Sequence, residues 1–347
     1  MIFTGDVAIA HDDRFIFKNM EHLHLKSWII NLEGFVTSES SYSKKWCVYN
    51  TTKWDESFID FNIKAAFIGN NHIQDIENGV SQSISYLSKR NIPFFGAGSN
   101  VEEKCSSVSV RVDSVNYRLL GFGWSVIGCK AGSQGSPGVN SFDYDNVISQ
   151  TKFLLKSCDD TRLVIVIHGN YEFESSPQPG HRKIARELID LGVYSVIFHH
   201  PHIVGPIERY KGRTIAYSLG NWAFSYGKYF DGKLKFPDKS FPQIALEFSE
   251  DGDVVHHALF VPPATVEFLG SELIHSEGFA LKPEFEGFSD SEYYVWFKEN
   301  RLKNKLLPIY TSTDNSLKNW FKDSWVHVRH LIVDTMAKIG IKAMRSK

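Results

Sequence analysis

The sequence predicts an α/β protein with a helical appendage at its C-terminal end, and three observations lead to this prediction. Short apolar segments recur from the N-terminus to about residue 261. Amphipathic stretches of helical periodicity lie between several of them. Most of the apolar segments end at Asp, Glu, Asn or His. In an α/β sheet neighbouring strand ends converge on one edge, so this pattern predicts a functional site there.

The expected strands are apolar runs bounded by turn residues. They cover residues 1–10, 28–32, 65–68, 93–96, 106–112, 117–124, 162–167, 194–198 and 214–219, followed by a closing hairpin at 244–261. Two turn-rich stretches are expected to form loops, at residues 36–53 and 125–141.

The expected helices carry apolar residues three and four positions apart. They cover residues 13–27, 77–90, 143–157, 181–191 and 316–343. Gly192 suits the C′ position after the fourth of them. Beyond about residue 270 the strand pattern stops. The sequence therefore predicts a main domain over residues 1–270 and a helical extension over residues 271–347.

Composition narrows the class of protein. The chain of 347 residues has a formal net charge of −2, which argues against a nucleic-acid-binding protein. A hydrophobic fraction of 42% indicates a globular chain, and no apolar run reaches transmembrane length. The first residues lack the pattern of a signal peptide, and the four cysteines lack C-x-x-C spacing. We therefore expect a soluble cytoplasmic protein with reduced thiols.

The most informative segment is His199-His200-Pro201-His202, which directly follows an apolar run. Pro201 prevents a helix from continuing through it. If the backbone stays extended, strand alternation places His200 and His202 on one side, about 7 Å apart along the chain. Two imidazoles so placed can both turn onto metal. The alternative is that these histidines only make ordinary hydrogen bonds. We favour the metal interpretation because ligand-type residues end several other strands.

Ligand-type residues recur at the ends of the other expected strands. They are Asp6, Glu33, the pair Asn71 and His72, His168 with Glu172 downstream, and Asn221. Oxygen ligands together with neutral imidazoles suit Mn, Fe or Zn rather than calcium or a thiolate-bound ion. A carboxylate flanked by histidines can hold two metals about 3.5–4 Å apart, which supports phosphoryl transfer by metal-activated water.

The ordered motifs GD, NLE, NNH, HGNYEF, HHPH and YSLGNW resemble those of the CapA family. This family is named for poly-γ-glutamate capsule synthesis and belongs to the calcineurin-like metallophosphoesterases. The resemblance covers about residues 1–262. It implies a four-layer α/β/β/α sandwich with the site at one end of the two sheets, holding one or two divalent metals.

The resemblance also implies a role for each matching residue. The implied metal ligands are Asp6, Glu33, Asn71, His168, His200 and His202. Asp6 and His202 correspond to first-metal ligands, Glu33 to the bridging carboxylate, and the other three to second-metal ligands. His72 corresponds to the catalytic imidazole that faces the phosphate. The positions that border the site are Glu172, His199 and Asn221.

One departure from the wider superfamily concerns the first metal. Metallophosphoesterases in general carry D-x-H at the first motif, and Ala8 stands where that histidine would be. We expect one tight and one loose metal, unless water or another side chain such as His11 completes the shell. The sequence also begins without the membrane anchor usual in capsule proteins, which favours a soluble enzyme of capsule or surface-glycan metabolism.

Three functions are compatible with these residues. The first is a metal-dependent hydrolase of phosphomonoesters or phosphodiesters, in which His72 polarises the phosphoryl oxygen or assists the leaving group. The second is hydrolysis or transfer at a γ-glutamyl amide, since a metal-activated water can also attack a carbonyl carbon. The third is a non-catalytic component of capsule biosynthesis. In each case the expected partner is anionic, either phosphate-bearing or polyglutamate-like.

The expected C-terminal helix carries an apolar stripe with tryptophans and basic residues around it. The stripe consists of Leu317, Phe321, Val328, Ile332, Val333, Met336 and Ile339. The favoured interpretation is that this stripe packs on the domain, or on a second copy of the chain in a homodimer. The alternative is a helix that lies in a membrane interface, which would make the protein peripheral at the inner membrane face.

Overall fold

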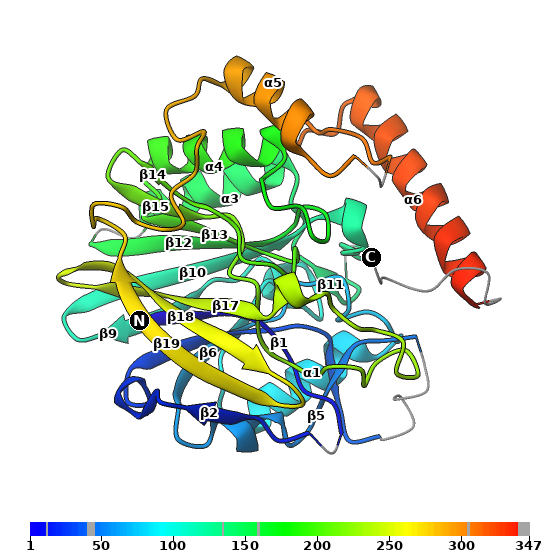
Figure 1. Cartoon of the computed structure of the whole chain (residues 1–347). Coiled ribbons are helices and arrows are strands. Elements are labelled where there is room, and N and C mark those ends of the chain that lie inside the picture. The colour runs from blue at the N-terminus through cyan, green and yellow to red at the C-terminus, as the bar shows by residue number, and fades with distance from the viewer. Residues whose placement is uncertain (12, 40–45, 134, 158–159, 304–305, 339–347) are drawn as a thin grey trace.

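The computed structural model describes residues 1–11, 13–39, 46–133, 135–157, 160–303 and 306–338. Two β-sheets pack face to face, and helices cover their outer sides (Figure 1). This arrangement confirms the predicted four-layer α/β/β/α sandwich.

The first sheet follows the order β2-β19-β18-β17-β1-β3-β6-β7, and β16 pairs with β1 off this path. Its strands are β1 (Ile2–Ala8), β2 (Ile16–Lys18), β3 (Ser27–Leu32), β6 (Asn62–Phe67), β7 (Phe94–Phe95), β16 (Asn221–Phe224), β17 (Pro242–Ser249), β18 (Gly252–Val261) and β19 (Thr265–Leu273). β1, β3, β6 and β7 run parallel, whereas β17, β18 and β19 form an antiparallel meander beside β1. β1 and β3 are buried along their whole length, as expected of central strands covered on both faces.

The second sheet follows the order β14-β15-β13-β12-β10-β9. Its strands are β9 (Val108–Val112), β10 (Val115–Gly123), β12 (Thr161–His168), β13 (Ser195–His199), β14 (Ile207–Tyr210) and β15 (Arg213–Ala216). The four central strands run parallel. Two short pairs lie outside both sheets: β4 (Phe35–Thr37) with β5 (Tyr49–Thr51), and β8 (Ala97–Gly98) with β11 (Gly138–Val139).

An apolar layer joins the two sheets. Phe3 and Ile29 of the first sheet belong to one buried cluster with Val164 and Ile197 of the second. Residues next to them along each strand point the other way, as strand alternation requires, and belong to the outer core.

Helices complete the outer layers. α1 (Gly79–Lys89) lies outside the first sheet, and α3 (Tyr144–Ser157) and α4 (Pro179–Leu191) lie outside the second (Figure 1). A short helix, α2 (Val101–Lys104), follows β8. Gly192 ends α4 in the left-handed conformation, with φ 110°, as predicted.

The structure corrects the prediction at the edge of the first sheet. Residues 13–27 do not form a helix, because they contain β2 and a 3-10 turn at Glu21–Leu23. Leu25, expected on the apolar face of that helix, is 88% exposed. β2 instead pairs with β19, a strand that the sequence did not predict. Because this pairing joins distant segments of the chain, local periodicity does not reveal it.

The segment after the main sheets packs closely on α4. β19 continues through Leu273, past the predicted boundary at residue 270. Nη2 of Arg182 donates to Oε1 of Glu208 over 3.0 Å and to the backbone oxygens of Phe285 and Phe288 over 2.9 and 3.0 Å. The ring of Tyr293, in α5 (Asp290–Asn300), lies 4.6 Å from the same guanidinium. The first part of the extension is therefore continuous with the core.

The last helix, α6 (Leu317–Lys338), does not pack its predicted stripe on the domain. Leu317, Phe321, Val328 and Ile332 are between 53% and 71% exposed. Val333 and Met336 are half-buried, and Ile339 lies outside the described residues. The interpretation that this stripe covers the domain is therefore wrong. None of the helices in the described ranges is long and apolar enough to cross a membrane.

Candidate metal centre

The polar residues predicted to bind metal gather at one end of the sandwich, where strands of both sheets end. Asp6 lies near the end of β1, and Glu33 directly follows β3. From the second sheet, His168 ends β12 and His200 follows β13. These two strand ends are level, because His168 pairs with His199 across β12 and β13.

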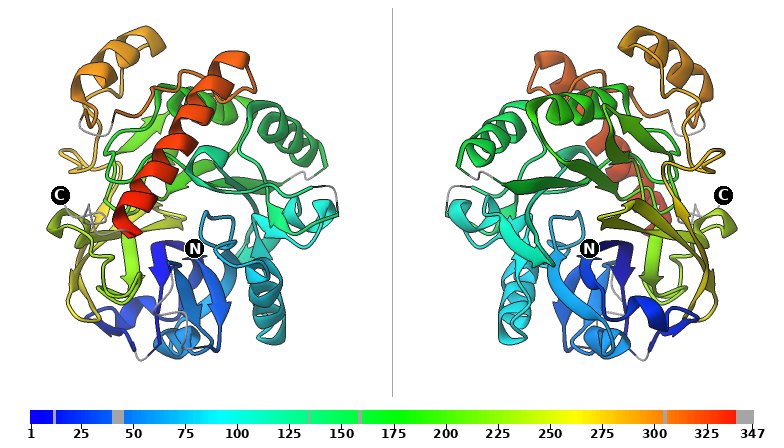
Figure 2. Two further views of the ribbon diagram at one scale, coloured as in Figure 1. Left: turned by 90° about the vertical axis from the view of Figure 1, so that its right-hand side faces the viewer. Right: turned by 90° about the vertical axis from the view of Figure 1, so that its left-hand side faces the viewer.

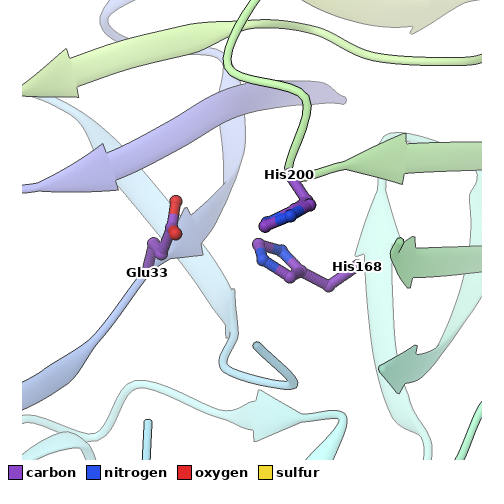
Figure 3. Close-up of side chains that lie close together, drawn as sticks. All are labelled: Glu33, His168 and His200. Atoms are coloured by element: carbon purple, nitrogen blue, oxygen red, sulfur yellow. The ribbon is translucent and has the colours of Figure 1, made fainter. Parts of the chain in front are cut away.

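Two groups of ligand-type side chains share Glu33. One group is Glu33, His168 and His200, and the other is Asp6, Glu33 and His202. Within each group, one possible ligand atom per residue lies within 4.8 Å of the others, and all these side chains are buried. Figure 3 shows Glu33, from the first sheet, opposite His168 and His200, from the second. A carboxylate common to both groups is the arrangement expected of a bridging ligand.

The carboxylate of Glu33 lies 3.7 and 3.9 Å from ring nitrogens of His202 and His72, beyond hydrogen-bond distance. The side chain is fully buried, and neither oxygen has a hydrogen-bond partner within the described part of the chain. Burial raises the pKa of Glu33 to about 7, a rise that the charge of His202 opposes and that of Asp6 reinforces. A buried carboxylate without hydrogen bonds is costly. The residues around Glu33 therefore fit a bound cation.

The carboxylate of Asp6 is held by three side chains. Nδ1 of His199 lies 3.2 Å from its Oδ1, Nδ1 of His202 lies 3.1 Å from its Oδ2, and the amide of Asn31 donates to Oδ1. Burial alone would raise the pKa of Asp6. The close ring nitrogens of His199 and His202 outweigh burial and keep this pKa well below its usual range. Asp6 is therefore ionised and held in one orientation.

The group of Glu33, His168 and His200 has a neutral histidine. Burial, reinforced by the neighbouring His200, keeps the pKa of His168 well below its usual range. Nε2 of His168 lies 2.8 Å from Oδ1 of Asn71, whereas its Nδ1 has no hydrogen-bond partner among the described residues. The rings of His168 and His200 lie 5.0 Å apart. A neutral imidazole with a free ring nitrogen suits a metal ligand.

The backbone turns sharply at the histidine segment, which corrects the assumption of an extended chain. β13 ends at His199, and His200 and His202 have φ values of 96° and 58°. Non-glycine residues rarely adopt these left-handed values, and each costs roughly 1–3 kcal/mol. The turn places the rings of His200 and His202 5.5 Å apart, so the predicted clustering of the two histidines holds despite the different backbone.

Gly5 explains why Asp6 can approach the segment before β16. A Cβ at Gly5 would lie 2.3 Å from the carbonyl oxygen of Gly220, so any larger residue would push β16 away. The backbone N–H of Asp6 donates to that same carbonyl over 2.9 Å. Asn221, the next residue, then lies within hydrogen-bond distance of His202, one of the candidate metal ligands.

Residues 3–226 match the family described as bacterial capsule synthesis protein PGA_cap. This chain belongs to that family. It is 30% identical to the PGA biosynthesis protein CapA of Bacillus subtilis over 203 residues, which cover 57% of this chain and 53% of that one. It is 27% identical to the capsule biosynthesis protein CapA of Bacillus anthracis over 166 residues, covering 46% and 40%. The chain thus matches about half the length of these relatives.

Solved structures show more distant likenesses to this member of the capsule synthesis family. A 5′-nucleotidase precursor from Thermus thermophilus has a TM-score of 0.40 and 11% identity, over 86% of this chain and 58% of that one. The NAD nucleotidase of Haemophilus influenzae has a TM-score of 0.35 and 10% identity, over 89% and 52%.

His72 lies beside the candidate metal ligands, and a carboxylate contacts the other side of its ring. Its Nε2 lies 3.9 Å from Oε1 of Glu33, and its Nδ1 lies 2.8 Å from Oδ2 of Asp75. The same Asp75 oxygen accepts a hydrogen bond from the backbone N–H of Val48 over 2.9 Å. Asp75 therefore fixes the ring with Nδ1 toward the protein and Nε2 toward the site.

The predicted border residues of this family member also lie at the site. Oδ1 of Asn221 is 2.9 Å from Nδ1 of His202. His199 contacts Asp6, as described above, and the charge of Glu172 influences the pKa of Glu33 and of His202. His202 has its pKa raised to about 9, because the charges of Glu33 and Asp6 outweigh the opposing effect of burial.

The group of Asp6, Glu33 and His202 offers three possible ligands, and nothing at Ala8 adds to them. Ala8 is a buried strand residue beside Phe224. His11, considered as a replacement, lies 5.8 Å from the ring of Tyr49 and belongs to neither ligand group.

The residues that position the side chains of the site were not predicted from the sequence. Asp75 and Asn31 are two of them, and Asn70 is a third. Oδ1 of Asn70 accepts from the backbone N–H groups of Gly34 and His72 over 3.0 and 3.1 Å. Their positions in the sequence could have indicated two of them. Asn70 directly precedes Asn71, and Asp75 lies three residues after His72.

Proposed function

We propose that this protein is a metal-dependent phosphoester hydrolase of capsule or surface-glycan metabolism. The observation that carries the proposal is the position of Glu33. Its two buried oxygens have no hydrogen-bond partner in the described residues, and it is common to both ligand groups. An acidic residue so placed suits a pair of divalent cations better than it suits a purely structural role.

The residues divide between two metal positions. Asp6, Glu33 and His202 would hold the first metal, and Glu33, Asn71, His168 and His200 the second. When bound, such ions supply Lewis acidity and lower the pKa of a coordinated water. The nearby ring of His199 and a hydrogen bond from Asn31 would keep the Asp6 ligand ionised and oriented.

His72 would act on the substrate rather than on the metal. With Nδ1 held by Asp75, its Nε2 faces the Glu33 side of the site. A protonated His72 could donate from Nε2 to a phosphoryl oxygen or to the leaving-group oxygen, and Asp75 would stabilise the imidazolium. The anionic substrate would supply the oxygens that the metals and His72 contact.

A second candidate is hydrolysis or transfer at a γ-glutamyl amide. The printed name of the Bacillus subtilis relative, a PGA biosynthesis protein, favours this alternative. The same residues would serve, because Lewis acidity and an activated water act on carbonyl groups as well. A non-catalytic role in binding an anionic polymer is the third candidate.

A substrate panel separates these candidates. Metal-free protein would be supplied with Mn²⁺ or Zn²⁺ and assayed with p-nitrophenyl phosphate, bis-p-nitrophenyl phosphate and γ-glutamyl-p-nitroanilide. We expect hydrolysis of a phosphoester. Hydrolysis of the anilide alone would favour the amide candidate, and inactivity on all three with metal bound would favour the non-catalytic role.

The variant His72→Ala tests whether His72 acts on the substrate or binds the metal. Loss of a positioned proton donor lowers turnover by about 10²–10⁴-fold, and we expect bound metal to stay unchanged. The exposed His22→Ala is the matched control and should keep full activity. Loss of metal in step with activity would instead place His72 among the ligands.

A further inference from the structure

Helix α6 turns its more apolar face to the solvent. Nine positions lie within an arc of about 140° at 100° per residue. These positions, named here the outer face, are Leu317, Trp320, Phe321, Ser324, Trp325, Val328, Leu331, Ile332 and Thr335. None carries a charge, and the seven large apolar side chains are between 53% and 71% exposed. A helix of a globular protein normally buries such a face.

Specific contacts fix this orientation. The opposite side of α6 buries Val326 and Asn319. Nδ2 of Asn319 donates to the backbone oxygens of Ser312 and Asp314 over 3.1 and 2.9 Å. The hydroxyl of Tyr310 donates to Oδ1 of Asp323 over 2.6 Å. These polar contacts hold the helix with its outer face directed away from the domain.

Tyr310 and the turn after β10 connect α6 to the end of the sandwich that carries the metal centre. The ring of Tyr310 packs against Trp124 at 4.9 Å. Trp124 directly follows β10, whose last residue, Gly123, pairs with His168. α6 also contacts the 3-10 turn η4 (Ser125–Ile127), and Figure 2 shows it running across this end of the molecule.

Cationic side chains border the outer face. Lys318 and Arg329 lie along one edge of it, and neither forms an ion pair within the described residues. Lys322 turns toward the domain instead, with its Nζ 3.3 Å from Oδ1 of Asn319 and 5.0 Å from the centre of the Tyr310 ring. On the other edge, Asp323 is engaged by Tyr310. Two tryptophans within the apolar face and a basic edge are typical of a helix that lies in a membrane interface.

We propose that the outer face of α6 binds the surface of a bilayer that contains anionic lipid. The apolar side chains would enter the boundary between headgroups and acyl chains, and the basic edge would contact the headgroups. Because α6 does not span a membrane, it would lie in the plane of the surface. The end of the sandwich that holds the metal centre would then face the bilayer.

A second copy of the chain fits this face less well. The outer face is about 27 Å long at 1.5 Å per residue and about 10 Å wide. The basic edges would not supply opposite charges to each other.

Vesicle flotation of the full-length protein tests the proposal. One set of vesicles contains phosphatidylcholine alone, and the other also contains phosphatidylserine. We expect binding to the second set at low salt and its loss at high salt. Reversing two basic residues in Lys318→Glu/Arg329→Glu should weaken binding by about tenfold or more.

A double variant of the outer face tests whether its apolar side chains are needed for vesicle binding. Phe321→Asp/Val328→Asp should abolish flotation, whereas Leu25→Asp/Leu269→Asp, two exposed leucines elsewhere, should leave it unchanged. An unchanged circular dichroism spectrum would establish that each variant is folded. If the outer-face double variant does not fold, Trp320→Ala takes its place. The proposal is overturned if the wild type binds neither vesicle, or if the outer-face variant floats like the wild type. Sedimentation showing a lipid-independent dimer that this variant dissociates would overturn it in favour of self-association.

Discussion

Nδ1 of His72 lies 2.8 Å from Oδ2 of Asp75, and the opposite ring nitrogen faces the bridging position of Glu33. This pair links a residue that would contact the substrate to a carboxylate that would not. It predicts that the charge on Asp75 influences catalysis through the orientation and protonation of His72.

Asp75→Asn should lower turnover by about 10–100-fold while bound metal stays constant, since it removes a carboxylate that orients a site residue. An amide still accepts the hydrogen bond from Val48, so the loop keeps its backbone contact. The assay is kcat together with metal content, and the pH profile should shift because His72 becomes harder to protonate. The exposed Asp190→Asn is the control, and equal activity of both variants would remove Asp75 from the mechanism.

A second prediction concerns acid stability and His181. Its ring is fully buried among Trp124, Phe142 and Phe198, and neither nitrogen has a hydrogen-bond partner in the described chain. Burial lowers the pKa of His181 from 6.5 to about 3. The unfolded state therefore takes up a proton that the folded state does not, between those two values. Stability is fully present above pH 6.5 and is lost as the pH falls.

His181→Phe should remove this loss, because phenylalanine does not titrate. Each pH unit is worth about 1.4 kcal/mol of unfolding free energy. Between pH 6.5 and about pH 5, the wild type should lose about 2 kcal/mol more than the variant. Urea unfolding at both pH values measures the difference, with the exposed His22→Phe as control. An identical pH dependence of wild type and His181→Phe would show that His181 is protonated or solvated in the folded state.

The third prediction concerns the buried ion pair of Arg182 and Glu208, whose side chains are 1% and 0% exposed. Arg182 also binds two backbone oxygens of the segment before α5. Arg182→Ala leaves those groups without a partner and should cost about 3–5 kcal/mol of unfolding free energy. Denaturant unfolding measures it, and the exposed Arg111→Ala should change little. A cost below about 1 kcal/mol would show that the C-terminal segment is only loosely attached.

Much of the site could be predicted because chemistry and topology agree in the sequence. Asp6, Glu33 and His168 each end or follow an apolar strand, and parallel strands bring such ends together. The buried core strands were predicted for the same reason, since their apolar runs are continuous. The histidine segment was also recognisable, although its backbone turns where an extended chain was assumed.

What could not be predicted depends on long-range contacts. β2 is a strand because β19 lies beside it, and its own three residues carry no strand pattern. The outer face of α6 looks like a core stripe in sequence, and contacts made in the folded chain, among them those of Asn319, Val326 and Asp323, determine which side turns inward. The contacts of Asn31 and Asp75 with site residues likewise arise from the folded arrangement.

Titration of metal-free protein with Mn²⁺ in a calorimeter shows whether Glu33 is shared by two metal positions. We expect two binding events of unequal affinity in the wild type, the weaker at the group of Asp6 and His202. His168→Ala should lose only the tighter event, whereas Glu33→Gln should lose or severely weaken both. No binding by the wild type, or two unchanged events in Glu33→Gln, would show that Glu33 is not a shared metal ligand.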